Sequence, residues 1–260
     1  MSDLRLHVAG SIGTITLDRP DRRNALTRGL LAELRQALGD LHQERRVRTV
    51  VLTAAGTAFC AGMDLAEMQA TAAADDAELL FGRDAGEYRH LLTEMLHFPK
   101  PIVARVNGPA VAGGAGLLLA CDLVVAAASA RFGLPEPRRG IVAGIVAPLL
   151  VYRIGAGQAA RLLLTSELIA APEAHRLGLY HELVEPDELD ARVAEVASQT
   201  ARGAPEALQL TKRLLNETIG EQLTTQLAAG AAASATARTT DAAAEGLAAF
   251  LEKREAEWGK

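Results

Sequence analysis

A glutamate between two prolines is the side chain in this sequence best suited to acid–base chemistry. Glu136 stands between Pro135 and Pro137 in an otherwise apolar stretch. The prolines restrict the backbone on both sides, and an apolar setting shifts the pKa of a carboxylate toward the range in which it can exchange protons. The same pattern alone also fits an exposed glutamate in a turn. Its interpretation therefore depends on what the rest of the chain brings to it.

Two loops of small residues, each between a predicted strand and a predicted helix, could bind negative charge. They contain Ala61-Gly62-Met63 and Ala112-Gly113-Gly114. Free backbone N–H groups at the start of a helix attract anions, and glycine lets a ligand approach closely because it has no Cβ. Two facing loops could offer two N–H donors to one oxygen of an enolate or tetrahedral oxyanion, and one such donor is worth roughly 3 kcal/mol of barrier. A Gly-Gly pair before an apolar helix is more often a sign of tight packing, so this pattern gains weight only beside Glu136.

The composition argues against several classes of protein. The chain has 260 residues, of which 49% are hydrophobic and 23% charged, enough for one substantial core or a core with a smaller appendage. A net charge of −5 and only 3% aromatic residues argue against nucleic-acid binding. Neither a signal-peptide pattern nor a membrane-spanning apolar run is present, so we expect a cytoplasmic protein. Cys60 and Cys121 are predicted to be buried free thiols, and the six histidines lack metal-ligand spacing, so no metal is expected.

The hydrophobic pattern predicts an α/β protein. Thr27 is a predicted N-cap of a helix with a leucine face, and the stretch from Ala72 to Asp84 is interpreted as a mobile flap before a helix at 91–98. The last sixty residues contain three Ala-rich helical segments, which must pack on the core or on a second subunit. The predicted strands are two short ones within 4–18 and single ones at 47–53, 102–106, 123–127 and 180–184.

Several motifs in the right order resemble the enoyl-CoA hydratase/isomerase, or crotonase, superfamily from about Ile12 to Arg254. The implied fold is a crotonase-like spiral of ββα units. Residues 1–200 would form the core with the acyl-CoA site, and residues 201–260 a C-terminal helical region that builds trimers, often paired into hexamers. The motifs are ITLDRPDRRNAL, FCAGMDLAEM, PKPIVARVNGPAVAGGAGLLLACDLVVA, ARFGLPEPRRGIV, LTSELIAAPEAHRLGLYHELV and EGLAAFLEKR.

The resemblance assigns roles to particular residues. The backbone N–H groups of Met63 and Gly113 match the donors to the thioester oxygen, and Glu136 matches one of two catalytic glutamates. Coenzyme A would be part of the substrate, so no separate cofactor is expected. The residues that match contacts to coenzyme A are Arg22 and Arg23 in a turn, Ala61, Asp64 and Leu65 around the adenine and pantetheine, and the C-terminal pair Phe250 and Lys253.

One position departs from the hydratase pattern. The second catalytic glutamate should lie three residues after Gly113, where this chain has Gly116. Hydration with one carboxylate requires Glu136 to activate water and return the same proton, whereas moving a double bond needs only one base. The run from Glu136 to Pro148 nevertheless resembles hydratase-like proteins of branched or terpenoid acyl-CoA breakdown, which share this glycine.

Three functions therefore stay open. The first is a 2-enoyl-CoA hydratase of fatty acid metabolism, which the motifs favour. The second is a Δ3,Δ2-enoyl-CoA isomerase or another enolate-forming acyl-CoA enzyme, and the third is a non-catalytic acyl-CoA-binding protein. Tyr88 and His90 lie on a predicted helix that borders the acyl pocket, and neither is expected to take part in the chemistry.

Overall fold

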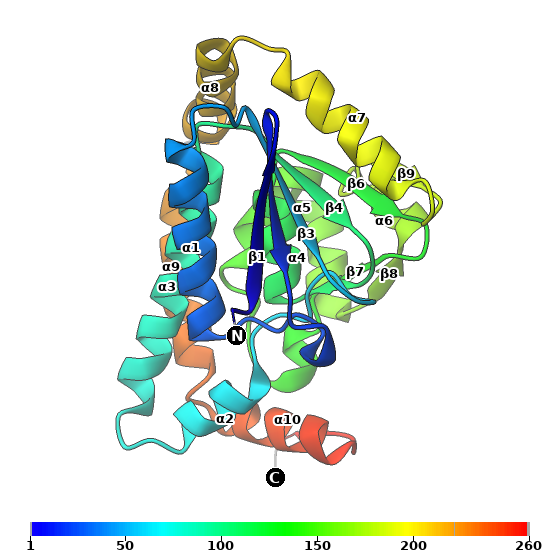
Figure 1. The fold of residues 1–260 in the computed structure, drawn as a ribbon. Coiled ribbons are helices and arrows are strands. Elements are labelled where there is room, and N and C mark those ends of the chain that lie inside the picture. Colours follow the sequence, from blue (N-terminus) through cyan, green and yellow to red (C-terminus); the bar gives the residue numbers. More distant parts are fainter. Residues whose placement is uncertain (1, 221, 259–260) are drawn as a thin grey trace.

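A parallel sheet with an antiparallel hairpin at one edge organises the molecule (Figure 1). The computed structural model describes residues 2–220 and 222–258. In this part of the chain β1 and β2 pair antiparallel, and the strands from β2 onward run parallel to one another. The order across the sheet is β1 (Leu4–Ala9), β2 (Ile12–Leu17), β3 (Thr49–Ala54), β4 (Ile102–Val106), β6 (Leu123–Ala127) and β9 (Glu182–Val184). Each lies within or beside a predicted strand.

A second, smaller sheet positions the loops that carry the glycines. It consists of β5 (Ala110–Val111), β7 (Arg131–Gly133) and β8 (Leu168–Ala170), with β7 in the middle. β7 leads directly to the turn of Glu136, and β5 leads directly to Gly113. The pairing of β5 with β7 therefore brings the predicted base and one predicted amide to the same part of the fold.

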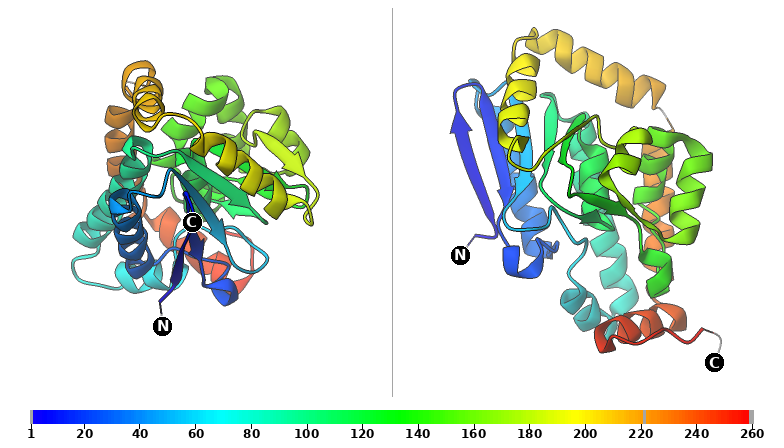
Figure 2. Two further views of the ribbon diagram at one scale, coloured as in Figure 1. Left: turned by 45° about the horizontal axis from the view of Figure 1, so that its top comes forward. Right: turned by 90° about the vertical axis from the view of Figure 1, so that its right-hand side faces the viewer.

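Helices cover both faces of the larger sheet. α7 packs on one face, where Leu189, Val193 and Val196 meet the valines of the central strands, and α1, α3 and α4 lie on the other (Figure 2). The helices before the C-terminal region are η1 (Pro20–Arg22), α1 (Arg28–Gln43), α2 (Leu65–Ala72), α3 (Ala77–His97), α4 (Gly113–Ala120), η2 (Glu136–Arg139), α5 (Val146–Thr165), α6 (Ala171–Arg176) and α7 (Leu189–Ala201).

α1 shows how local sequence sets an element. The Thr27 hydroxyl accepts a hydrogen bond from Leu30 N at 3.0 Å, which satisfies one of the free donors at the helix start. The predicted cap is confirmed. The leucine face is buried against the sheet, and it comprises Leu30, Leu31, Leu34, Leu38 and Leu41.

The C-terminal region packs on the core of its own chain. α9 lies against α3 and α5, and α10 lies near α2 at one end of the molecule (Figures 1 and 2). Because the side chains of α9 are mostly small, the helix can approach its neighbours closely, as at Gly230 against Gly144. The elements of this region are α8 (Pro205–Arg213), the π-helix η3 (Leu214–Ile219), α9 (Leu223–Ala237) and α10 (Asp241–Glu252).

Two local predictions are wrong. The stretch from Ala72 to Asp84 is not a flap, since α2 ends at Ala72 and α3 already begins at Ala77. Buried Phe81 and Asp84 anchor this part of α3, which the Ala- and Asp-rich sequence did not indicate. The second error concerns the apolar stretch 141–154, whose sequence predicts breaks at Gly144 and Pro148. Pro148 does not break it, because it lies in the first turn of α5, where no backbone donor is needed.

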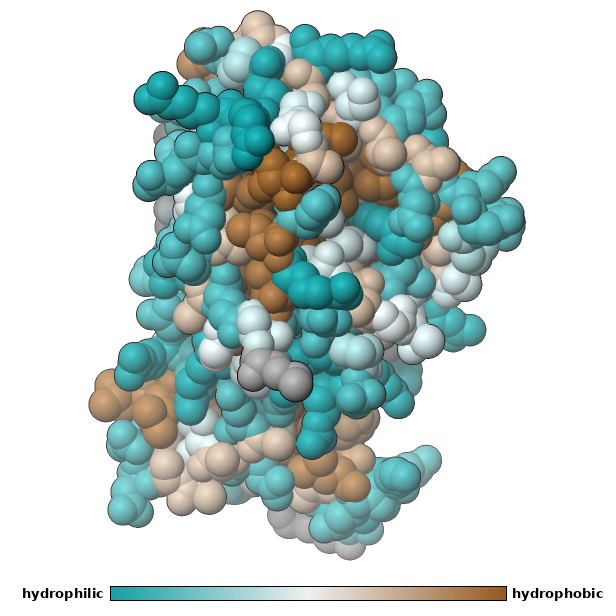
Figure 3. All heavy atoms as spheres, in the orientation of Figure 1, coloured by the Kyte–Doolittle hydropathy of each residue, from teal (hydrophilic) through white to brown (hydrophobic). Residues whose placement is uncertain are grey.

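The surface is mostly polar, with apolar side chains gathered over the sheet between α1 and α7 on the face shown in Figure 3. Within the described residues, no helix combines the length and the apolar character that a membrane crossing requires.

Candidate active site

The two glycine-containing loops lie side by side. Val111 N donates to Cys60 O at 3.0 Å, and an isolated bridge joins Cys60 to Ala110. The first loop is also tied to Leu26, whose N–H donates to Gly62 O at 2.8 Å and whose carbonyl accepts from Asp64 N at 2.9 Å. These contacts hold Met63 between two fixed neighbours and direct its N–H away from Leu26.

The N–H groups of Met63 and Gly113 come together at the junction of these loops. A Cβ at Gly113 would lie 3.6 Å from Met63 N, and a Cβ at Gly62 would lie 3.1 Å from Gly113 N. No group in the described part of the chain accepts a hydrogen bond from either N–H. Ala112 turns the chain into α4 with a φ of +52°, an uncommon backbone conformation for a residue with a side chain. The fold thus leaves two adjacent donors free beside the start of a helix.

Of the two neighbouring glycines, Gly114 allows the loops to pack closely and Gly113 carries the free N–H donor. A Cβ at Gly114 would lie 2.3 Å from Cys60 O, so Gly114 is required for packing of the two loops. A Cβ at Gly113 would meet nothing closer than Leu26 Cδ1 at 3.4 Å. The packing interpretation of the Gly-Gly pair therefore applies to its second member. Gly62 has a φ of +92° and would clash with Ala112 if it carried a side chain.

Glu136 is buried, with 6% of its surface exposed, at the start of η2. Its Oε2 has no hydrogen-bond partner among the described residues. Burial raises the pKa of Glu136 to about 7, against the opposing charges of Arg139 and Arg238. A cavity of about 490 Å³ is lined by Glu136 together with Met63 and Gly113. The carboxylate and the two residues that carry the free donors thus share one cavity.

Tyr88 fills the space beside Gly116. A Cβ at Gly116 would lie 2.1 Å from the Tyr88 hydroxyl oxygen and 3.0 Å from Val146 Cγ2. The buried hydroxyl donates a hydrogen bond of 2.5 Å to the carbonyl oxygen of Gly113. Burial, with the charge of Glu136 adding to it, raises the pKa of Tyr88 well above its ordinary value, so the phenol keeps its proton.

The residues expected to contact coenzyme A occupy different places. Arg23 and Ala61 line a groove that Pro135 also lines, and Leu65 lines the cavity of Glu136. Arg22 is exposed on η1 and lines neither the cavity of Glu136 nor this groove, and the same holds for Lys253 at the end of α10. Phe250 is 48% exposed, and its ring stacks on the guanidinium of Arg139 at 4.3 Å.

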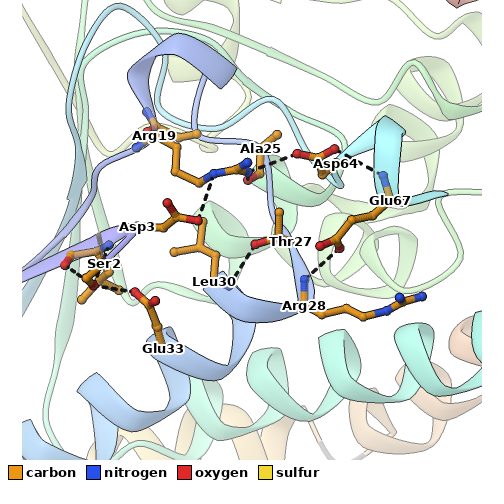
Figure 4. Close-up of polar contacts among 12 residues, drawn as sticks. Ser2, Asp3, Arg19, Ala25, Thr27, Arg28, Leu30, Glu33, Asp64 and Glu67 are labelled. Carbon is orange, nitrogen blue, oxygen red and sulfur yellow. Dashed lines mark hydrogen bonds and ion pairs between the residues drawn. The ribbon is translucent and has the colours of Figure 1, made fainter. Parts of the chain in front are cut away.

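Asp64 has a structural task of its own (Figure 4). Its carboxylate accepts hydrogen bonds from Ala66 N and Glu67 N at the start of α2, and it forms an ion pair of 3.2 Å with Arg19. In the same view, Thr27 caps α1 and Arg28 N donates to Glu67. These contacts fix the first loop relative to α1 and α2, so that Met63 is held by structure on both sides.

Cys60 and Cys121 are buried and free, as predicted. Burial raises the pKa of both thiols to about 12, so neither is a thiolate near neutral pH. Among the described residues, no group of His, Cys, Asp and Glu side chains has the arrangement of a metal site.

Several cavity residues are not identified as site residues by the sequence, among them Tyr88, Arg139 and Arg238. The sequence places Tyr88 on a bordering helix without a task, and it assigns nothing to the two arginines. Their positions depend on packing between elements far apart in the chain, and no local pattern marks them. The one available signal for Tyr88 was the missing side chain at Gly116, which implies that another residue fills the space.

Comparison with solved structures identifies the architecture as the α/β crotonase fold with C-terminal helices. A crystal structure of an enoyl-CoA hydratase from Mycobacterium avium matches with a TM-score of 0.89 and 32% identity over 100% of both chains. The enoyl-CoA hydratase/isomerase family model matches residues 7–260, and the chain belongs to this family.

Curated relatives show the same similarity over nearly their whole length. A Thermus thermophilus protein that carries the name of an enoyl-CoA hydratase is 42% identical over 94% of this chain and 96% of its own length. The short-chain-enoyl-CoA hydratase of Clostridium acetobutylicum is 33% identical over 99% of this chain and 97% of its own length. The predicted superfamily and fold are therefore confirmed.

Proposed function

We propose that this protein is a 2-enoyl-CoA hydratase in which Glu136 is the one catalytic carboxylate. The observation that carries the proposal is the buried Oε2 of Glu136, which lacks a partner and lies in the cavity that Met63 and Gly113 also line. An unpartnered buried carboxylate oxygen is costly, and active sites are where such groups gather. The names of the relatives from Thermus thermophilus and Clostridium acetobutylicum support the same activity.

The reaction requires two groups of atoms to act together. The N–H groups of Met63 and Gly113 bind the thioester oxygen, and the Glu136 carboxylate takes a proton from water. The resulting hydroxide forms a bond to C3, the C2=C3 electron pair moves toward the thioester carbonyl, and the negative charge gathers on the oxygen as an enolate. The enolate then collapses as C2 takes the proton from the Glu136 carboxyl group. Water is added in full, and Glu136 ends in its starting state.

The environment of Glu136 suits both halves of this cycle. A base with a pKa of about 7 is ionised in a useful fraction near neutral pH and becomes a competent acid after it takes up the proton. The free N–H groups stabilise charge that develops only during the reaction, and they are already oriented by the two loops. One carboxylate therefore suffices, at some loss of rate relative to a pair.

Isomerisation is the second candidate, and the observation in its favour is the glycine at position 116. With no carboxylate at Gly116, Glu136 alone can take a proton from C2 of a 3-enoyl thioester and return it to C4. The oxyanion would be held by the same two N–H groups, so the site chemistry differs only in whether water enters.

Two substrates separate these functions. With crotonyl-CoA, hydration is expected to remove the enoyl absorbance, and the 3-hydroxyacyl product can be identified by mass. With a 3-enoyl-CoA, isomerisation would make that absorbance appear. If the enoyl absorbance appears rapidly from the 3-enoyl substrate and is not lost from crotonyl-CoA, the isomerase replaces the hydratase proposal.

A non-catalytic acyl-CoA-binding role makes a different prediction for Glu136→Gln. Under the hydratase proposal this variant loses a factor of roughly a hundred or more in turnover, because it removes the acid–base group. A matched control is Glu94→Gln on α3, since Glu94 is paired with Arg35 at the surface and does not line the cavity of Glu136. No turnover above background in either protein would leave only the binding role, and an unchanged, measurable turnover in Glu136→Gln would remove Glu136 as the acid–base group.

Coenzyme A is expected to be bound as part of the substrate by the groove that contains Arg23 and Ala61. The positive charge of Arg23 and the neighbouring Arg138 supports phosphate binding there. Lys253 and Arg22 are exposed and free to meet a nucleotide from either the same or a neighbouring subunit. The expected effect of Arg23→Ala is a raised KM for crotonyl-CoA with kcat little changed.

We also infer that the chain forms trimers, with residues 201–260 as the assembling region and residues 1–200 as the core. Exposed leucines on α8 and η3 support this, since Leu210, Leu214 and Leu215 expose 62%, 54% and 48% of their surfaces. Light scattering on the purified protein tests the proposal: a mass of three or six chains is expected, and a monomer would contradict it.

A further inference from the structure

Arg238 is a charged side chain in the cavity to which the proposed reaction assigns no task. It follows the last residue of α9, and its side chain lines the cavity of Glu136. Its Nε and Nη1 atoms are buried, and neither has a hydrogen-bond partner among the described residues. The guanidinium carbon lies 5.9 Å from the ring centre of Phe81. Two buried donor nitrogens of this half-buried side chain thus face no acceptor, which is unusual in a folded protein.

The carboxylates near Arg238 do not satisfy these donors. Asp84 receives two hydrogen bonds from Arg28, to Oδ1 at 2.6 Å and to Oδ2 at 2.8 Å, so its charge is already paired. Glu136 acts on Arg238 through its charge, and it forms no hydrogen bond with the guanidinium. The positive charge of Arg238 is therefore balanced only at longer range.

Arg238 lies on the acyl side of the proposed site. It lines the cavity of about 490 Å³ and an adjoining cavity of about 420 Å³, whose other lining residues are mostly apolar, among them Leu65, Met68 and Phe81. The groove with Arg23 and Ala61, which we assign to coenzyme A, does not include Arg238. An acyl chain that extends past Glu136 away from that groove would therefore pass Arg238.

An alkyl chain and a charged chain have opposite effects on this arginine. An apolar chain would displace the remaining water and leave the guanidinium more deeply buried without a partner, which is unfavourable. A carboxylate at the end of the chain would accept a hydrogen bond from one of these free donors and would neutralise the guanidinium charge. The apolar lining would still hold the methylene groups in between.

We propose that Arg238 binds a carboxylate at the far end of the acyl chain, and that the preferred substrates are 2-enoyl-CoA monothioesters of dicarboxylic acids. This inference rests on the proposed function for the orientation of the thioester. Arg238 is then a specificity residue that does not touch the reacting atoms. A substrate with a simple alkyl chain would bind less tightly but would still be hydrated.

Binding of saturated acyl-CoA esters tests the inference without depending on turnover. Hexanoyl-CoA and adipoyl-CoA have acyl chains of equal length and differ in the terminal carboxylate, and octanoyl-CoA and suberoyl-CoA form a longer pair. Calorimetry on the wild-type protein is expected to show tighter binding of the dicarboxylic ester by about tenfold or more in at least one pair. Arg238→Met is expected to abolish this preference and to bind hexanoyl-CoA at least as tightly as the wild type.

A matched control removes the same charge elsewhere in the C-terminal region. Arg213→Met on α8 is expected to keep the full preference, because Arg213 is paired with Glu217 at the surface and lines neither cavity that Arg238 lines. Equal affinities in every wild-type pair would overturn the inference, as would a preference that persists in Arg238→Met. Hydration of crotonyl-CoA is measured separately. If hydration is absent but the preference for the dicarboxylic ester is intact, only the proposed hydratase activity is removed. If hydration is present without that preference, only the role of Arg238 is removed.

Discussion

The hydroxyl of Tyr88 occupies the space that a side chain at Gly116 would need. The two residues lie on α3 and α4, and a Cβ at Gly116 would approach the Tyr88 oxygen to 2.1 Å. In the hydratase pattern this position carries the second glutamate, whereas here a phenol that keeps its proton stands beside Gly113. The glycine is therefore linked to the tyrosine, and the two must be considered together.

Gly116→Ala is expected to destabilise the protein by ~1–3 kcal/mol, because the new methyl group meets the Tyr88 hydroxyl and Val146 in a packed interior. The measurement is urea unfolding. Adding Tyr88→Phe should recover part of the loss, since the next atom of Tyr88, Cζ, lies 3.2 Å from the new Cβ.

Gly82→Ala is the matched control for this substitution. Gly82 lies on α3, and a Cβ there would meet nothing within 4 Å. It should raise stability by ~0.5–1 kcal/mol through helix propensity. A Gly116→Ala variant as stable as Gly82→Ala would show that Tyr88 does not fill the space.

Tyr88→Phe is expected to lower kcat for crotonyl-CoA by about tenfold with little change in KM. The hydroxyl donates to the carbonyl of Gly113, and its loss loosens the residue whose own N–H is one donor to the developing charge. Steady-state kinetics test this. A change in KM alone would show that Tyr88 shapes the pocket without positioning Gly113.

The pH dependence of kcat/KM is expected to follow the ionisation of Glu136. Burial raises its pKa to about 7, and the reaction begins with the carboxylate, so the rate should rise through pH ~7 and level off above it. A rate profile on crotonyl-CoA measures this midpoint. A midpoint near the ordinary glutamate value of ~4.3 would mean that the rate-controlling base is not buried.

The same ionisation should appear in stability. The pKa of Glu136 is higher in the folded state than in the unfolded chain, where it is near the ordinary value, so its contribution is fully favourable below pH ~4.3 and is lost as pH rises through about 7. At about pH 8 the free energy of unfolding of Glu136→Gln should therefore exceed that of the wild type by about a few kcal/mol, so the variant unfolds at a higher temperature. Near pH 4 the two proteins should unfold at a similar temperature. Thermal unfolding at both pH values gives the comparison. A pH-independent difference would argue against a buried charge at this position.

The sequence predicted those features that depend on short stretches of chain. The Thr27 cap, the leucine face of α1 and the positions of the larger sheet's strands along the chain followed from spacing, because hydrogen bonds at a helix start and hydrophobic periodicity act locally. The motifs around Met63, Gly113 and Glu136 likewise identified residues that the fold brings into one cavity.

The remaining features depend on packing between distant elements. Tyr88 reaches Gly116 from a different helix, and Arg238 reaches the cavity of Glu136 from about a hundred residues further along the chain. The error from Ala72 to Asp84 has the same origin, since Arg28 on α1 holds Asp84 in place and makes a polar stretch into helix.

Conversion of crotonyl-CoA by the wild-type protein and by Glu136→Gln tests the central claim most directly, provided that binding of crotonyl-CoA is measured on both. We predict that the wild type forms the 3-hydroxyacyl thioester and that Glu136→Gln binds the substrate with similar affinity while its turnover falls by roughly a hundredfold or more. Equal turnover by the two proteins would contradict the assignment of Glu136 as the group that moves the proton.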